Sequence, residues 1–340
     1  MKKNLKFVAA CLSIAVALQV VGTEVKAQLI EGAISDVPVA AKFLPKSIHA
    51  RFMSIAANGG NLIAVGERGI IIRSTDKGAT WKQMASPVDI TLASVAFETP
   101  QRVWAVGQAA SILKSENGGA TWKVVRYKPS DLRYYLKVIP RNGVIQIAAS
   151  DGELWESRDA GSSWTMTSLE NAEAFPHLFS LAYVGETGLL SGERGSVFLR
   201  SENDATWKVL PTPYNGSFFG VTSFGDQFLL FGMSGKAYLV SANGTKQQAI
   251  ETQTTQFLLD AVVMPAKNQA LLVGRGGIMV LIGNEGQVIS RLQRPDNADI
   301  TAVTVEGEDI YLTTMKGGIL RLKANSLMTS NTQEPKASAN

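Results

Sequence analysis

Residues 74–81 read Ser-Thr-Asp-Lys-Gly-Ala-Thr-Trp. The pattern returns in residues 115–122 as Ser-Glu-Asn-Gly-Gly-Ala-Thr-Trp and in residues 157–164 as Ser-Arg-Asp-Ala-Gly-Ser-Ser-Trp. A fourth copy, residues 201–207, reads as one residue shorter and lacks the glycine, and three eroded copies follow at Asn243-Gly244, Asn284-Glu285-Gly286 and Asn325. The complete copies are Asp boxes, in which a turn carries Asp or Asn, then Gly, then Trp.

The Asp or Asn positions of the seven copies recur at a nearly constant distance. They are residues 76, 117, 159, 203, 243, 284 and 325, so the steps are 41, 42, 44, 40, 41 and 41 residues. A second landmark keeps the same phase, since Gly-Glu-Arg-Gly at 66–69 and 192–195, and Gly-Arg-Gly-Gly at 274–277, each precede a short apolar run. A period of this size indicates a propeller or a solenoid.

Within each unit, apolar runs of strand length alternate with turns rich in Gly, Asn and Asp, and no run has sustained helical periodicity. The sequence therefore predicts an all-β, seven-bladed β-propeller of four-stranded antiparallel blades over residues 28–327. The seventh unit ends after its third strand at 319–322. We expect residues 28–45 to supply the fourth strand and close the ring, and residues 328–340 to form a disordered polar tail.

The N-terminal residues have the layout of a secretory signal peptide. Lys2, Lys3 and Lys6 precede an apolar stretch from about residue 7 to 21, and a small residue, Ala27, stands at the expected cleavage point. We expect residues 1–27 to be removed, which places the protein in the periplasm or an equivalent lumen. Lipidation at Cys11 is the alternative; few residues precede Cys11, and most of the apolar stretch follows it.

Charge and cysteine content exclude several classes of protein. The net charge of +4 includes the signal peptide; without Lys2, Lys3, Lys6, Lys26 and Glu24, 29 basic residues face 28 acidic ones, a net charge of +1. Such a balance does not favour nucleic acid as a partner. Cys11 is the only cysteine, so the mature chain has no disulfide or thiolate ligand. No later segment has the apolar length of a spanning helix.

The Asp boxes have a structural explanation. Asp or Asn accepts hydrogen bonds from the turn, Gly permits positive φ, and Trp packs its large apolar face. Because the acids recur with the motif, we interpret them as structural rather than catalytic. The residues assigned this role are Asp76, Trp81, Asn117, Trp122, Asp159, Trp164, Asn203 and Trp207.

A binding site is expected where the repeat is broken. The turns between the second and third strands carry charge in four of the seven units, and strand alternation sends these turns to the end of the disc opposite the Asp boxes. The predicted partner-binding residues are Glu67, Arg68, Arg194, Arg275 and Lys316. Ordinary solvated surface charge is the alternative explanation.

The sequence predicts no metal, cofactor or catalytic site. His49 and His177 are the only histidines, and two histidines without cysteine make a poor zinc site. A sialidase-like glycosidase would need an arginine cluster, a Tyr/Glu pair and a general acid. Tyr134 and Tyr135 are candidates for that role by residue type alone.

The Asp boxes, the seven units and the Gly-Glu-Arg-Gly turns together resemble the photosystem II stability/assembly factor family, whose members are related to sialidase-like Asp-box (BNR) repeat proteins. The resemblance covers residues 40–325. It implies a lumenal or periplasmic assembly chaperone that holds a membrane-protein subunit through a basic patch on one propeller face. Arg68, Arg194 and Arg275 are the residues here that match such a patch.

Three functions follow from this reading. The first is a secreted, non-catalytic propeller that binds protein partners during assembly of a membrane complex. The second is a sialidase-like glycoside hydrolase, and the third is an accessory subunit of an envelope transporter.

Overall fold

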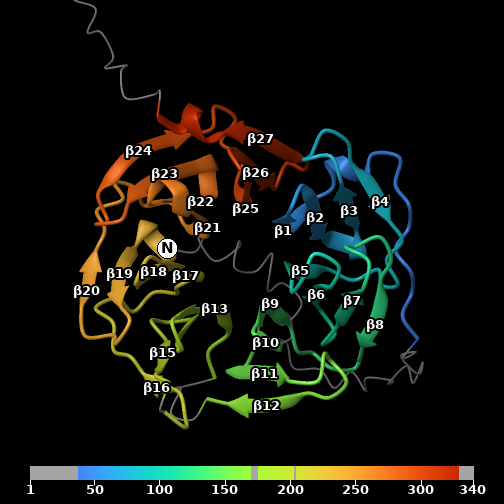
Figure 1. The fold of residues 1–340 in the computed structure, drawn as a ribbon, viewed down its shortest axis with the longest axis horizontal. Coiled ribbons are helices and arrows are strands. Elements are labelled where there is room, and N and C mark those ends of the chain that lie inside the picture. The colour runs from blue at the N-terminus through green and yellow to red at the C-terminus, as the bar shows by residue number, and fades with distance from the viewer. Residues whose placement is uncertain (1–36, 170–174, 203, 329–340) are drawn as a thin grey trace, which may run out of the picture. The chain divides into compact units, whose positions relative to one another are not determined.

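The computed structural model describes residues 37–169, 175–202 and 204–328. These residues form seven antiparallel sheets, which we number as blades 1 to 7 in chain order (Figure 1). Blades 1 to 3 contain β1 (Phe52–Asn58), β2 (Asn61–Gly66), β3 (Ile71–Ser74) and β4 (Lys82–Met84); β5 (Leu92–Phe97), β6 (Val103–Gly107), β7 (Ile112–Ser115) and β8 (Lys123–Arg126); and β9 (Tyr135–Arg141), β10 (Val144–Ala149), β11 (Glu153–Ser157) and β12 (Thr165–Ser168).

Blades 4 to 7 follow the same order. They contain β13 (Leu178–Val184), β14 (Thr187–Gly192), β15 (Val197–Arg200) and β16 (Lys208–Val209); β17 (Gly220–Phe224), β18 (Gln227–Phe231), β19 (Ala237–Ser241) and β20 (Gln247–Ala249); β21 (Leu258–Met264), β22 (Gln269–Gly274), β23 (Ile278–Gly283) and β24 (Val288–Gln293); and β25 (Ile300–Glu306), β26 (Asp309–Thr314) and β27 (Ile319–Lys323). Short 3₁₀ turns are η1 (Ser47–His49), η2 (Glu67–Gly69), η3 (Met233–Gly235), η4 (Pro265–Lys267), η5 (Arg275–Gly277) and η6 (Ala324–Met328).

The predicted seven-bladed β-propeller is therefore confirmed. The first strand of each blade lies innermost, and neighbouring first strands contact one another around the ring, with β1 against β25 where the two ends of the described chain meet (Figure 1). At that junction the Thr301 hydroxyl donates to the Phe52 carbonyl at 2.7 Å, and the Tyr311 hydroxyl donates to the Lys77 carbonyl at 2.6 Å.

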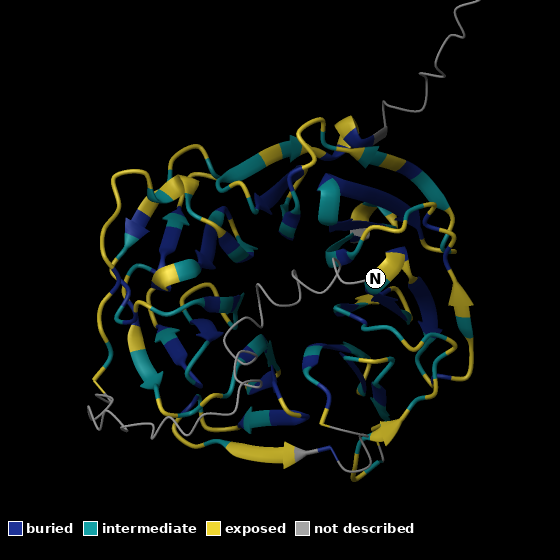
Figure 2. Ribbon diagram, turned by 180° about the vertical axis from the view of Figure 1, so that it is seen from behind, coloured by how far each residue is buried: buried dark blue, intermediate teal, exposed yellow. Residues whose placement is uncertain are grey.

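Burial decreases from the middle strands of a blade to its outer strand. The second strands are buried along nearly their whole length, whereas the outer strands β16 and β20 are mostly exposed (Figure 2). The second strand is flanked by strands on both sides and by neighbouring blades on both faces, so it reads as a continuous apolar run. The core is thus a set of apolar layers between adjacent blades.

The seventh blade differs from the prediction. In the described residues it has three strands, and no strand pairs with the outer edge of β27. Residues 37–45 contain no strand; they lie against blade 1, where the Ala41 amide donates to the Ser86 carbonyl at 3.0 Å and Gln83 bonds the backbone of Lys42 and Leu44. Closure by residues 28–45 is therefore not confirmed. Residues 28–36, the predicted signal peptide and residues 329–340 of the predicted tail lie outside the described chain.

Candidate functional site

The antiparallel blades give the ring two different ends. We call one the turn face, formed by the turns between second and third strands and by the connections between blades, and the other the Asp-box face, formed by the remaining turns. The predicted binding residues lie on the turn face, in η2, in η5 and in the turns 193–196 and 315–318. The Asp boxes lie at the opposite end.

The turn in blade 1 shows how a side chain is presented on the turn face. Arg68 has φ 56° and Gly69 has φ 67°, so the chain reverses in the left-handed region. A Cβ atom on Gly69 would lie 1.8 Å from the Val88 carbonyl oxygen, which excludes any other residue there without movement of the backbone. The turn is thus held against the connection to the next blade, and Arg68 is left exposed.

Strand register shows which turn residues are equivalent around the ring. The residues in the place of Arg68 are Ala109, Asp151, Arg194, Ser234, Gly276 and Lys316. Arg275 is instead equivalent to Glu67 and Glu193. The predicted cations therefore do not form a continuous ring, because blade 3 presents an acid and blades 2 and 5 present uncharged residues.

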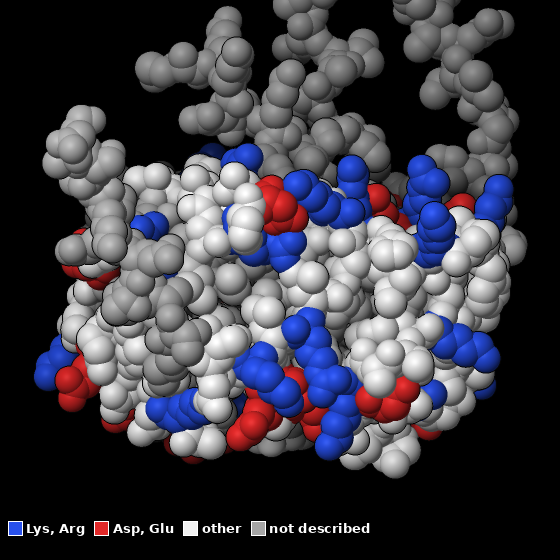
Figure 3. All heavy atoms as spheres, turned by 90° about the horizontal axis from the view of Figure 1, so that it is seen from above, with Lys and Arg blue, Asp and Glu red and all other residues white. Residues whose placement is uncertain are grey.

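Ion pairs reduce the positive charge further. Arg275 lies 3.8 Å from Asp299, and Lys316 lies 3.8 Å from Asp296 and also donates to the Asp296 carbonyl at 2.9 Å. Glu67 pairs with Arg51 at 3.5 Å. On the rim over blade 7 and its neighbours, basic and acidic side chains are likewise intermingled (Figure 3). The charge of the turn face is mixed rather than uniformly basic.

An aromatic strip on the turn face was not predicted from the sequence. Phe179 and Phe219 have ring centroids 5.5 Å apart, Phe219 and Phe257 are 5.6 Å apart, and the Arg275 guanidinium lies 5.2 Å from the Phe257 ring. Phe179 lies at the start of β13 in blade 4, whereas Phe219 and Phe257 lie one residue before the inner strands β17 and β21 of blades 5 and 6; all three residues are partly exposed. Aligning the units by repeat phase would have revealed one phenylalanine near this place in three successive units.

A cavity of 500 Å³ lies on the same face between blades 5 and 6. Its walls include η3, the connection after β20, and Arg291 and Gln293 of β24. Its polar groups are mainly threonine hydroxyls and glutamine amides, and Thr252 is held by a 2.7 Å hydrogen bond to the Gly235 carbonyl. The turn face thus combines a partly exposed aromatic strip with a polar hollow farther out.

The Asp-box residues make local contacts within their turns. Asp76 accepts from the Thr80 amide at 2.9 Å, from the Thr80 hydroxyl at 2.6 Å and from the Ser74 hydroxyl at 2.7 Å. Asp159 accepts the same set from Ser163 and Ser157. The hydrogen bonds from Thr80 and Ser163 hold the pKa of each carboxyl at about 2, below the ordinary 3.8. Asn117 makes the equivalent contacts with Thr121 and Ser115.

The box tryptophans pack between blades. Trp122 is 7% exposed and joins the apolar layer between blades 1 and 2, while Trp164 meets Trp104 of blade 2 edge to face at 6.2 Å. Trp81 packs on the layer between blades 7 and 1, and Trp207 on that between blades 3 and 4. Each tryptophan therefore links its own blade to the preceding one.

The fourth box is corrected by the structure. Arg200 pairs with Gly188 in the same register in which Ser74 pairs with Leu62, and each stands seven positions before its box tryptophan. The box is not shortened: Arg200 replaces the serine, Glu202 the acid and Asp204 the glycine. The predicted position, Asn203, lies outside the described residues.

The structure describes the surroundings of two residues considered for catalysis or metal binding, Tyr135 and His177. Tyr135 is fully buried, and burial raises the pKa of its hydroxyl group. His177 Nδ1 accepts a hydrogen bond from the Asp151 amide at 3.2 Å. In residues 37–169, 175–202 and 204–328, no three His, Cys, Asp or Glu residues are arranged to hold a metal ion. The same residues contain no helix with the length and hydropathy needed to cross a bilayer.

Comparison with known proteins supports the family resemblance. A family profile described as "Photosynthesis system II assembly factor YCF48" matches residues 79–222. Among solved structures, "YCF48 bound to D1 peptide" is similar with a TM-score of 0.66 and 16% identity, over 84% of this chain and 99% of that one. "YCF48 from Cyanidioschyzon merolae" has a TM-score of 0.66 and 14% identity, over 83% and 98%.

The structural likeness alone shows the fold. The WD40 propeller domain of Doa1 also has a TM-score of 0.66, at 13% identity and over 84% of this chain and 95% of that one. No curated protein sequence matches the chain. The sequence profile therefore carries the distinction between families.

Proposed function

Because the chain carries the repeat of the photosystem II assembly factor family over residues 79–222, we propose that it is a non-catalytic propeller that binds a protein partner. The partner we propose is a subunit of a membrane protein complex, and the role is to assist its assembly or stability. This proposal follows the YCF48 structure bound to a D1 peptide, whose fold this chain shares.

The observation that carries the proposal is the aromatic strip of the turn face. Phe179, Phe219 and Phe257 bridge three blades and are each partly exposed, and Arg275 lies over the last ring. Protein interfaces are enriched in aromatic residues and arginine, and such residues dominate binding energy near the centre of an interface. Arg194, exposed on the turn of blade 4, flanks the strip.

The predicted binding residues fall into two groups in this proposal. Arg194 and Arg275 border the aromatic strip on blades 4 to 6. Glu67, Arg68 and Lys316 lie on blades 1 and 7, where they add a mixed-charge rim. Rim charges chiefly affect the rate of encounter, whereas aromatic anchors affect the lifetime of a complex.

The proposed compartment is the periplasm or an equivalent lumen. It rests on the signal-peptide layout of residues 1–27. Sequencing the N-terminus of protein recovered from the native envelope tests it, since a chain starting near Gln28 is expected. Recovery of a chain that starts at Met1, or of one lipidated at Cys11, contradicts it.

The binding proposal is tested by capturing membrane proteins from the native envelope with purified mature protein. We expect Phe219→Ser with Arg275→Glu to lower recovery of the retained membrane subunit at least tenfold. The matched control replaces two exposed lysines near the opposite face, Lys82→Glu with Lys123→Glu, and should leave recovery unchanged. Equal recovery with both folded variants contradicts a binding role for the strip.

A further inference from the structure

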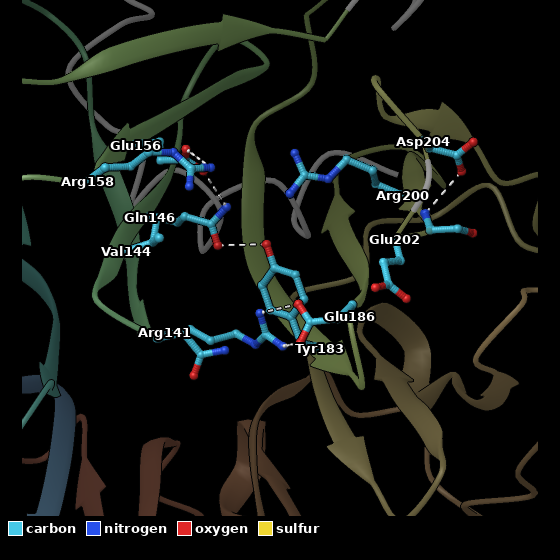
Figure 4. Close-up of a pocket in the computed structure, with 12 residues that line it drawn as sticks. Arg141, Val144, Gln146, Glu156, Arg158, Tyr183, Glu186, Arg200, Glu202 and Asp204 are labelled. Atoms are coloured by element: carbon cyan, nitrogen blue, oxygen red, sulfur yellow. Dashed lines mark hydrogen bonds and ion pairs between the residues drawn. The ribbon is translucent and has the colours of Figure 1, made fainter.

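A cleft of 470 Å³ opens between blades 3 and 4 on the Asp-box face, opposite the turn face (Figure 4). Its blade 3 wall contains Gln146 and Glu156, and Tyr183 and Arg200 come from blade 4. The volume is within the range of small-molecule sites, about 300–1,000 Å³. The cleft is separate from every residue assigned to partner binding.

The cleft exists because two positions break the repeat together. In blades 1, 2 and 3 the box glycine packs directly on a side chain of the preceding blade. A Cβ atom on it would lie 2.7 Å from Tyr311, 2.3 Å from Ile63 and 2.6 Å from Trp104, respectively. Blade 4 has Asp204 in the place of this glycine, and blade 3 has Gln146 in the place of the apolar partner. The turn of blade 4 cannot make the close contact, so a polar space is left.

The inner wall of the cleft is a continuous hydrogen-bonded network. The Tyr183 hydroxyl donates to Gln146 Oε1 at 2.7 Å, Gln146 Nε2 donates to Glu156 at 3.1 Å, and Glu156 pairs with Arg158 at 2.6 Å. Gln146 is buried. Because each side chain fixes the next, this wall is arranged before any ligand arrives.

A second group fixes the edge of the cleft. Arg141 forms two hydrogen bonds to the Glu186 carboxylate, at 2.7 and 3.1 Å, and its guanidinium lies 4.4 Å from the Tyr183 ring. Asp204 pairs with Lys208 of the neighbouring outer strand. These charges are thus already neutralised.

Two charged groups on blade 4 have no such partner. Arg200 lies over the Trp207 ring at 4.9 Å and forms no ion pair with any residue in the described part of the chain. Figure 4 shows it reaching from blade 4 toward Tyr183 and Gln146. Glu202, two residues on, is exposed and likewise has no ion pair within the described residues. A cation and an anion that form no ion pair within the described residues therefore both line the cleft.

We infer that this cleft binds a small zwitterionic ligand, an amino acid or short peptide, with its carboxylate on Arg200 and its ammonium group toward Glu202. A guanidinium stacked on an aromatic ring and next to hydrogen-bonding groups suits a planar carboxylate. Three arginines and four carboxylates line the cleft, so a dianion such as phosphate meets no net positive charge.

Calorimetric titration of the full chain tests this site. The probes are tri-alanine, free alanine, N-acetyl-tri-alanine, tri-alanine amide and inorganic phosphate. We expect binding of tri-alanine or alanine, with the better of the two identifying a peptide or an amino acid as the ligand. The amide, which lacks the carboxylate, should bind at least tenfold more weakly, and acetylation should weaken binding severalfold because it removes the ammonium group.

The decisive variant is Arg200→Ser, which restores the residue found in the boxes of blades 1 to 3. It should reduce affinity at least tenfold, while Lys82→Ser, the loss of one exposed cation on blade 1, should not. Thermal melts of both variants establish that they are folded. A third variant, Glu202→Gln, keeps the shape of the side chain but removes its charge. It should lower affinity for tri-alanine but not for N-acetyl-tri-alanine. Absence of binding by both zwitterions, tighter binding of phosphate, or unchanged affinity in folded Arg200→Ser overturns the inference. Because the turn face is untouched, failure here leaves the partner-binding proposal standing.

Discussion

The Asp boxes of blades 2 and 4 occupy the same place in their blades and have the same length, yet one closes an interface and the other opens one. In blade 2, the Ser115 hydroxyl accepts from the Gly119 amide at 2.8 Å and Gly119 packs on Ile63. In blade 4, Arg200 and Asp204 stand at those two positions and a cleft results. The repeated box residues hold the blades together. Where blade 4 departs from the repeat, an open space results, lined in part by charged groups that form no ion pair within the described residues.

The tryptophans of the two boxes also differ in burial and in hydrogen bonding, and the tryptophan of blade 2 is again the more completely packed. Trp122 is buried, and its indole N–H donates to the Gly119 carbonyl at 3.1 Å. Trp207 is only partly buried, and its Nε1 has no hydrogen-bond partner in the described residues. The blade 2 turn is a complete packing unit, whereas the blade 4 turn has exchanged part of its packing for polar groups.

Replacing each of the two tryptophans with alanine in turn should give the largest difference in stability between the two boxes. Trp122→Ala should cost about 3–5 kcal/mol, since it leaves a cavity between blades 1 and 2. Trp207→Ala should cost about 1–2 kcal/mol because its ring is less buried. Denaturant unfolding of both variants measures this, and equal losses would show that the two boxes contribute alike.

Alanine substitutions at the glycine position of the two boxes should give the next largest difference in stability. Gly119→Ala should cost about 1–3 kcal/mol, because the new Cβ would overlap Ile63 and because φ there is 86°. Asp204→Ala should change stability little, since the space beside it is already open. Thermal melts provide the comparison; a destabilised Asp204→Ala with a tolerated Gly119→Ala contradicts the packing explanation.

The sequence was sufficient for the fold because the Asp box recurs over seven units and the glycine-rich turn keeps the same phase in three of them. It was insufficient for the fourth box, where Ser201 was aligned with the box serine although sheet register gives that place to Arg200. Side-chain identity suggested one alignment, and hydrogen bonding between strands fixed another. The resulting cleft depends on Gln146 from the preceding unit, a contact that a linear motif does not contain.

For the predicted binding residues as well, the position of the turns followed from the sequence, whereas their contacts did not. The turns that carry Arg68 and Arg194 are in the expected place, because antiparallel alternation determines the end of the ring at which each turn lies. The ion pairs of Arg275 with Asp299 and of Lys316 with Asp296 join turns to connections between blades. The aromatic strip likewise joins residues about 40 positions apart in three units, so its continuity emerges only when the ring is closed.

Acid should distinguish the boxes that contain aspartate from the one that contains asparagine. The folded-state pKa of Asp76 and Asp159 is about 2, below the ordinary 3.8, so their contribution is present above about pH 4 and is lost as the pH falls toward 2. Asn117 makes the same contacts without titrating. Asp76→Asn with Asp159→Asn should therefore flatten the fall in melting temperature between pH 4 and 2. A fall as steep as in the unchanged protein would assign the acid sensitivity to other carboxylates.

The smallest effect on stability is expected on the turn face, where the four cations Arg68, Arg194, Arg275 and Lys316 separate into two pairs. Arg68→Glu with Arg194→Glu should change the free energy of unfolding by no more than about 0.5 kcal/mol per site, because both side chains are exposed. Arg275→Glu with Lys316→Glu should be somewhat more destabilising, since each new carboxylate would face an aspartate that now has a cationic partner, Asp299 or Asp296.

Both double variants should slow association with the membrane-protein partner, and the slowing should diminish in high salt as screening removes the electrostatic contribution. Association rates measured at two salt concentrations, together with thermal melts, check both expectations. If the folded double variants associate at the unchanged rate in low salt, the charges of the turn face are ordinary surface charges, and binding depends on the aromatic strip alone.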